Sequence, residues 1–150
     1  MNKKLEILRK YLLEEDGELY EGEEIEIING NLLEVIGEEY LVLTEEEAEE
    51  KAREEILGSL CYFRSGFILE HSIFWDSIPY GAETKEYEEI IKSIQEKENS
   101  ELIKVIIKDI DYFIEEAIRW DGRGHFINTY DGEEGEIYYN DELYYIYRIE

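Results

Sequence analysis

"EEYLVLTEEEAEEKAREEI", residues 38–56, is the stretch that decides the fold. Its first part, "YLVLT", is rich in β-forming residues, and Thr44 followed by Glu47 makes a capping box, which is typical of a helix start. The apolar residues that follow recur at three- and four-residue spacing: Ala48, Ala52, Ile56, Leu60 and Phe63. The pattern predicts a strand that runs directly into an amphipathic helix, with one face buried and the glutamates outside.

The residues before this stretch predict a short helix and two or three strands. "KKLEILRKYLLEE" places its apolar side chains on one helical face, and the helix is expected to end near Gly17: Leu5, Leu8, Tyr11 and Leu12 form that face. Ile25 and Ile27 then alternate with glutamates, and "NGN" is typical of a turn. We therefore expect strands near residues 24–43.

The residues after it predict more helices and a final hairpin. Helices are expected from Ser65, at about 84–97 and at 100–119, where isoleucines recur at helical spacing. "EGEIYYNDELYYIYRIE" has alternating apolar and aromatic residues on both sides of an Asn-Asp turn, which predicts a β-hairpin near 135–149. The expected fold is α+β, with about four helices packed on a small antiparallel sheet in a single domain, residues 1–150.

The charge is the most unusual property of the composition. Forty Asp and Glu stand against 15 Lys and Arg, which gives a formal net charge of -25, while 43% of the residues are hydrophobic. Such an excess destabilises a folded chain through self-repulsion and exceeds what solubility requires. It also opposes direct binding to nucleic acid or to anionic membranes. One cysteine, Cys61, excludes an internal disulfide and, with no signal or spanning segment in the sequence, favours a cytoplasmic protein.

"WDGRGHFINTYDGEE", residues 120–134, is the stretch whose residue types could most readily take part in binding or catalysis. Its glycines predict a chain return after a helix, but Asp121, Arg123 and His125 are also candidates for a partner-binding loop or for catalysis. No phosphate loop, dinucleotide motif or nucleophile elbow supports an enzyme. The chain also lacks an EF-hand pattern and the Cys and His pairs of a zinc site, so we expect no metal and no cofactor. His71, in an apolar segment, is expected in the core or at its boundary.

The acidic residues can be interpreted in two ways, as a solvated surface or as a DNA mimic. Twenty-five charges equal those on roughly 42 Å of duplex, close to the width of a domain of this size, about 35–40 Å. Spread evenly they would be about threefold too sparse, so mimicry requires that the carboxylates gather. Residues 14–26 hold eight acids and no base, and residues 44–55 hold seven acids. The candidate contact residues are Glu14, Glu15, Asp16, Glu18, Glu21, Glu23, Glu24, Glu45, Glu46, Glu49 and Glu50.

Three segments, "EEYLVLTEEEAEEKAREEI", "RWDGRGHFINTYDGEE" and "ELYYIYRIE", resemble a group of small acidic proteins of bacteriophages and prophages. The resemblance covers roughly residues 38–150 and assigns no role to any residue. It implies a mobile-element origin, and in that setting small acidic proteins often antagonise host nucleases. The inference from a mobile-element origin to nuclease antagonism is an analogy with other small acidic phage proteins.

The leading hypothesis is a non-enzymatic phage accessory protein, monomeric or homodimeric. It would inhibit a basic, nucleic-acid-binding host defence protein, such as a CRISPR or restriction effector, by acidic occlusion. The alternative is a protein-binding module that uses the "DGRGHF" loop and the aromatic hairpin (Tyr144, Tyr145, Tyr147), with the charge serving solubility only. For those tyrosines, however, the alternation in a strand favours a place in the core, covered by a helix layer. A third possibility is an enzyme using Asp121, Arg123 and His125.

Overall fold

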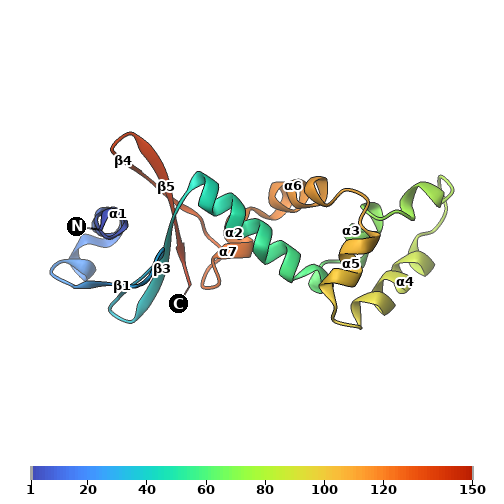
Figure 1. The fold of residues 1–150 in the computed structure, drawn as a ribbon, viewed down its shortest axis with the longest axis horizontal. Coiled ribbons are helices and arrows are strands. Elements are labelled where there is room, and N and C mark those ends of the chain that lie inside the picture. Colours follow the sequence, from blue (N-terminus) through green and yellow to red (C-terminus); the bar gives the residue numbers. More distant parts are fainter. Residues whose placement is uncertain (1, 150) are drawn as a thin grey trace. The chain divides into compact units, whose positions relative to one another are not determined.

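The computed structural model describes residues 2–149 (Figure 1). The chain divides into two compact units, which we call the sheet unit (Met1–Ala52 with Asp121–Glu150) and the helical unit (Arg53–Trp120). Each unit has its own buried apolar residues. The expectation that residues 1–150 behave as a single domain stays a prediction.

The sheet unit contains five antiparallel strands in the order β1-β2-β3-β5-β4. This confirms strands near 24–43 and a hairpin near 135–149. In the hairpin turn, Asn140 and Asp141 both have positive φ (51° and 66°), the backbone that a tight two-residue turn requires. The strands are β1 (Ile25–Asn29), β2 (Leu32–Val35), β3 (Glu38–Thr44), β4 (Gly135–Tyr139) and β5 (Glu142–Arg148).

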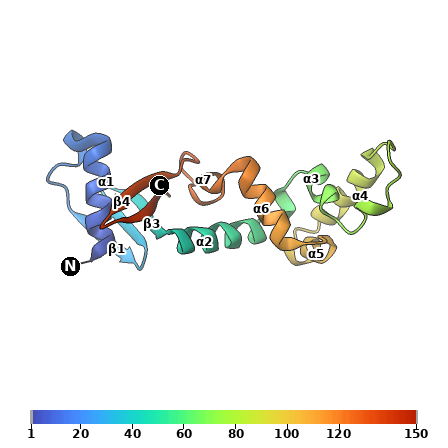
Figure 2. The same cartoon turned by 90° about the horizontal axis from the view of Figure 1, so that it is seen from above.

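Helix α1 (Lys3–Tyr20) covers one face of this sheet (Figure 1, Figure 2). Its apolar stripe, centred on Ile7 and Leu8, packs on alternate residues of four strands: Leu33, Val35, Tyr40, Val42, Ile137, Tyr144 and Ile146. The helix is kinked at Asp16, which has φ -156°, and one more turn follows Gly17. The expected end near Gly17 therefore marks the kink, whereas the helix itself continues to Tyr20.

Helix α2 (Glu45–Gly58) begins with the expected capping box. The Glu47 backbone N–H donates to the Thr44 hydroxyl at 3.2 Å, and the Thr44 N–H donates to the Glu47 carboxylate at 2.9 Å. The helix ends earlier than expected. A separate 3-10 turn, η1 (Leu60–Tyr62), carries the apolar stripe on to Phe63.

The helical unit corrects the expectation of one helix over residues 100–119. The chain forms α5 (Ser100–Ile106) and α6 (Ile110–Asp121), because Ile107 is extended and pairs with Ser72. The break is held by two backbone bonds, from Ile73 N–H to Ile106 O at 2.9 Å and from Lys108 N–H to His71 O at 2.8 Å. A tertiary pairing has thus overridden the local periodicity.

The helix count also differs from the expected four, since residues 2–149 contain seven α-helices. The additional short ones are α3 (Ser65–Glu70) and α7 (Arg123–Ile127), beside α4 (Lys85–Gln95) and the 3-10 turn η2 (Trp75–Ser77). Helices α3, α4 and α5 belong to the helical unit, as does α6 up to Trp120. The α+β class holds. None of the described helices is long and apolar enough to cross a membrane.

Candidate functional site

Arg123, a candidate of the 120–134 loop, is the centre of an ion-pair network in the sheet unit. Its guanidinium donates to Glu45 at 2.8 Å, to Glu49 at 3.0 Å and, through Nε, to Glu134 at 2.8 Å. It also lies over the Tyr145 ring at 4.4 Å, and its side chain is only 9% exposed. The network joins α2, α7, β5 and the segment before β4.

The charges in this network stabilise one another. Burial alone would lower the pKa of Arg123, but the hydrogen bonds that it donates to Glu45 and Glu134 raise it above its ordinary value. Hydrogen bonds from Tyr145 and Arg123 lower the pKa of Glu45. Burial, and then a hydrogen bond to Glu134, raise the pKa of the Tyr147 hydroxyl. Arg123 is therefore a permanent cation that holds the fold together, and little of it is accessible to a partner.

Asp121 and His125, the other candidates of the loop, are both exposed. His125 makes an edge-to-face contact with Phe126, at 4.9 Å between ring centroids. In the described part of the chain, neither shares a hydrogen bond or ion pair with Arg123. The catalytic hypothesis thus gains no geometric support, because general acid–base catalysis requires groups placed within hydrogen-bonding reach of one another.

The rest of the loop is organised by Asn128, a residue that sequence reasoning missed. Its side chain is buried, accepts hydrogen bonds from the N–H groups of Tyr130 and Asp131, and donates to the Glu133 carbonyl at 2.8 Å. These bonds satisfy the backbone of a compact turn. The second half of this stretch is therefore a hydrogen-bonded turn, and a partner-binding role for the stretch stays a prediction.

Three tyrosines on the second strand of the aromatic hairpin lie in the core, as one of the two interpretations expected. Tyr144, Tyr145 and Tyr147 are 3%, 7% and 0% exposed. Tyr144 packs beneath α1, and Tyr147 bonds to Glu134. The alternative hypothesis needed these three side chains at an interface, and in this respect it is wrong.

The acidic candidates on α1 and after it remain fully available. All seven are exposed, and none makes an ion pair with a described residue: Glu14, Glu15, Asp16, Glu18, Glu21, Glu23 and Glu24. The four candidates on α2 divide into two pairs. Glu45 and Glu49 bind Arg123, whereas Glu46 and Glu50 are exposed and lack such a partner among residues 2–149.

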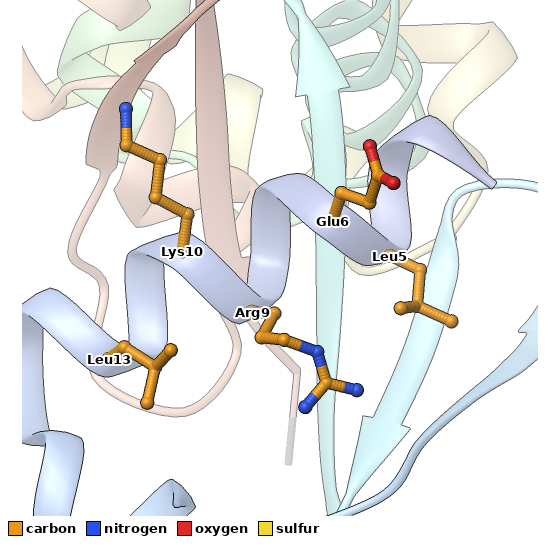
Figure 3. A pocket seen from close by; sticks show the side chains of 5 residues that line it. All are labelled: Leu5, Glu6, Arg9, Lys10 and Leu13. Carbon is orange, nitrogen blue, oxygen red and sulfur yellow. The ribbon is translucent and has the colours of Figure 1, made fainter. Parts of the chain in front are cut away.

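The first half of α1 is basic, in contrast to the second. There Leu5, Glu6, Arg9, Lys10 and Leu13 line a shallow basin on the outer side of the helix (Figure 3). Arg9 and Lys10 donate to the backbone carbonyls of Glu23 and Tyr138. An acidic contact surface therefore has to begin after this basin.

The sheet register brings together three more carboxylates that sequence reasoning did not select. Glu26 lies opposite Glu34 on β2, and Glu34 lies opposite Glu39 on β3. The three share the sheet face that points away from α1, since their neighbours Leu33 and Val35 face the helix. Like charges directly opposite one another destabilise a sheet. Only the strand register, which the sequence does not reveal, could have identified this row.

The two units carry different shares of the charge. Residues 1–52 and 121–150 hold 25 of the 40 acids and 7 of the 15 bases, a net charge of -18, whereas residues 53–120 hold 15 acids and 8 bases, a net charge of -7. The carboxylates are thus gathered in the sheet unit, which also holds the seven available acids of residues 14–24 and the glutamate row.

The described residues were compared with the ligand sets that metal ions require. No group of three or more His, Cys, Asp or Glu there could hold a metal ion. Cys61 is partly buried, with its sulfur 3.5 Å from the Ser100 hydroxyl. Comparisons with protein-family models, with characterised proteins and with solved structures gave no match to this chain. Function is therefore inferred from geometry and charge alone.

His71 lies at the boundary of the core, as expected, within an aromatic cluster of the helical unit. Its ring is 4.7 Å from that of Phe67 and 5.3 Å from that of Phe113. Burial lowers its pKa below the ordinary value of 6.5, against the opposing effect of Glu116 and Glu70. It is therefore held neutral in the fold at pH 7.

We expect His71 to make the protein less stable in mild acid. Because the pKa of His71 is lower in the folded state, the unfolded chain takes up the proton first. The free energy of unfolding is then highest above pH 6.5 and falls as the pH drops through 6.5 towards the folded pKa. Replacing His71 by Phe should reduce the difference in urea midpoint between pH 7.5 and pH 5.5. The matched control is His125→Phe at the exposed histidine, and an equal reduction in both variants would contradict the assignment to His71.

Proposed function

We propose that this chain is a non-enzymatic accessory protein of a phage or prophage that acts in the cytoplasm of the bacterial host. It inhibits a nucleic-acid-binding defence protein, of the CRISPR or restriction kind, by filling a Lys- and Arg-lined groove. It does not bind nucleic acid itself. The observation that carries this proposal is the run of seven exposed acids over residues 14–24, none ion-paired with a described residue, within a unit of net charge -18.

The spacing of carboxylates on the sheet supports mimicry of DNA phosphates, which acids spread evenly over the surface would not. Glu26, Glu34 and Glu39 sit on neighbouring strands, which lie about 4.8 Å apart. A DNA strand carries one charge per about 3.4 Å of helix axis, so the two spacings are similar. This row lies on the sheet face that points away from α1, so it gives the sheet unit a second acidic surface besides the acids of residues 14–24.

The acids without an ion-pair partner lower the stability of the free protein, and a role in binding would explain why the chain keeps them. Self-repulsion and the facing glutamates destabilise the free protein, and no described cation relieves them. A basic groove would remove this repulsion on binding and would speed association through long-range attraction. Glu45 and Glu49 contribute less, because Arg123 already neutralises them.

Neutralising four acids of residues 14–24 should strongly weaken inhibition. The chain is added to DNA-cleavage reactions of purified CRISPR and restriction effectors, and the quadruple change of Glu14, Glu18, Glu21 and Glu24 to Gln is compared with the parent. We expect inhibition by the parent to weaken at least tenfold between 0.1 and 0.5 M NaCl, because screening removes the attraction. The variant should require at least tenfold more protein at 0.1 M NaCl.

The control removes the same number of charges from the helical unit. Glu83, Glu86, Glu96 and Glu98 are exposed there, and their change to Gln should leave inhibition within twofold of the parent. Equal loss in both variants would mean that total charge matters and that the surface does not. No inhibition of any effector, or inhibition unaffected by salt, would refute the proposal.

A further inference from the structure

The break between α5 and α6 creates an exposed apolar surface in the helical unit. The segment after α3 is hydrogen-bonded to the end of α5, through Ile73 N–H to Ile106 O and Lys108 N–H to His71 O. This pairing places Ile73 beside the end of α5, whose Leu102 and Val105 lie one turn apart on the same helical side.

Five large apolar side chains remain exposed on these two segments. Val105 is 74% exposed and Ile73 52%, and Leu102, Phe74 and Trp75 are each more than a third exposed. We call these five residues the Trp75 patch. Contiguous apolar surface of this kind is characteristic of an interaction site, whereas scattered single side chains are not. At roughly 150–250 Å² per large side chain, the exposed part is on the order of 400 Å².

The charge around the patch differs from that of the rest of the protein. Residues 71–82 contain one acid, Asp76, and residues 102–108 contain two bases, Lys104 and Lys108, so the two segments together have a net charge of +1. The whole chain has -25. Asp76 and Lys108 form an ion pair with each other across the two segments. Asp76, Lys104 and Lys108 lie within these segments, and Glu101, one turn before Val105 on α5, adds a second negative side chain beside the patch, whose local charge is therefore close to zero.

We propose that the Trp75 patch is the contact surface of a homodimer. Two copies of so acidic a chain repel each other unless they meet where the local charge is not negative, and the two paired segments meet that condition. An isologous contact also needs a patch that complements itself. Apolar residues at the centre satisfy this need, and Asp76 and Lys108 at the rim can each face the opposite charge on the second copy.

The size of the patch sets the strength of the dimer. Standard interfaces bury about 800 Å² per partner, and those below about 600 Å² per partner are usually transient. An apolar surface on the order of 400 Å² with a polar rim therefore fits a reversible dimer that forms at micromolar concentrations. Such a dimer presents two acidic sheet units to their targets, but it does not depend on the proposed inhibition.

Sedimentation velocity and light scattering on the full chain between 1 and 200 µM test the proposal. We expect a shift from the 17.9 kDa monomer towards twice that mass as concentration rises. Association should strengthen between 0.05 and 0.5 M NaCl, because salt screens the repulsion between the two acidic chains. The proposed inhibition has the opposite salt dependence, so the failure of one proposal can be distinguished from the failure of the other.

Val105→Glu is the decisive variant, since this side chain is mostly exposed and the fold should tolerate the change. We expect its dimer dissociation constant to rise at least tenfold. Ile90→Glu is the matched control, an exposed isoleucine on α4 in the same unit, and it should stay within twofold of the parent. In a Trp120→Phe background, Trp75 is the single tryptophan, and its emission should shift to the blue on dimerisation.

Four results would overturn the proposal. One is a chain that stays monomeric at 200 µM in 0.5 M NaCl. Another is a dimer that Val105→Glu leaves unchanged, and the third is equal weakening by Ile90→Glu. A dimer whose Trp75 emission does not change with concentration would likewise place the contact elsewhere.

Discussion

Replacing Gly124 by Ala lowers the free energy of unfolding by at least about 3 kcal/mol, the largest stability effect we expect from a single methyl group. A Cβ at this position would meet the carbonyl oxygen of Gly132. It would also lie 2.8 Å from the carbonyl carbon of Glu133 and 3.0 Å from the Glu134 nitrogen. All three atoms are backbone, so the clash cannot be relieved by turning a side chain. The segment that must move carries Glu134, which binds Arg123 and Tyr147.

Gly17→Ala is the matched control for this substitution. Gly17 lies in α1 and does not have a positive φ, and no atom lies within 4 Å of the place that an added methyl group would take. Its replacement should leave stability unchanged or raise it by up to about 1 kcal/mol, since Ala is the better helix former. Urea denaturation followed by circular dichroism measures both variants. If Gly124→Ala proves as mild as Gly17→Ala, the close approach of α7 to residues 132–134 is not present in solution.

Replacing Arg123 by Ala should cost about 3 kcal/mol. The change removes the cation shared by three carboxylates and leaves Glu134 next to the buried Tyr147 hydroxyl without it. Removing one partner of a buried pair costs more than the pair contributes, because the remaining charge is left without compensation. Glu45 and Glu49 are more than half exposed, so water replaces part of the stabilisation that they lose with Arg123. The loss of stability therefore stays at the lower end of the range for a broken buried ion pair.

Arg119→Ala is the control for the loss of an arginine. Arg119 is 70% exposed and forms an ion pair with Glu116 at 3.3 Å on the same helix, so its removal should cost less than about 1 kcal/mol. Arg123→Lys should fall between the two, because an ammonium keeps the charge and cannot reproduce the several directed bonds of the guanidinium. Thermal unfolding ranks the three variants. A ranking in which Arg123→Ala equals Arg119→Ala would show that the network does not stabilise the protein.

The Arg123 network also narrows the proposed inhibitory surface. The sequence pattern groups the acids of α2 with those of α1 and makes Arg123 a partner-binding candidate. The structure joins Arg123 to two of those acids across 78 and 74 residues of chain. Their charges are therefore used within the fold. The acids of residues 14–24 become the main surface to test, and the row of Glu26, Glu34 and Glu39, on the sheet face away from α1, is a second one.

Short-range features were predictable because their causes lie within a few residues. The capping box of Thr44 and Glu47 and the Asn140-Asp141 turn depend on neighbouring side chains and on local backbone preference, and both are confirmed. The same kind of local reasoning wrongly predicted one continuous helix over residues 100–119. Their isoleucine spacing is helical throughout, but the pairing of Ile107 with Ser72 and the Asp109 side chain, which accepts from the Tyr112 N–H, interrupt the helix.

The amino-acid sequence alone determined the α+β class, the place of the strands and the size of the acidic excess, because composition and periodicity are local properties. Only the tertiary structure decided which carboxylates are available and which are neutralised. Strand register set Glu26, Glu34 and Glu39 in one row, and the return of the chain at α7 brought Arg123 to Glu45 and Glu49. Both outcomes depend on contacts between residues far apart in the chain, which no local pattern encodes.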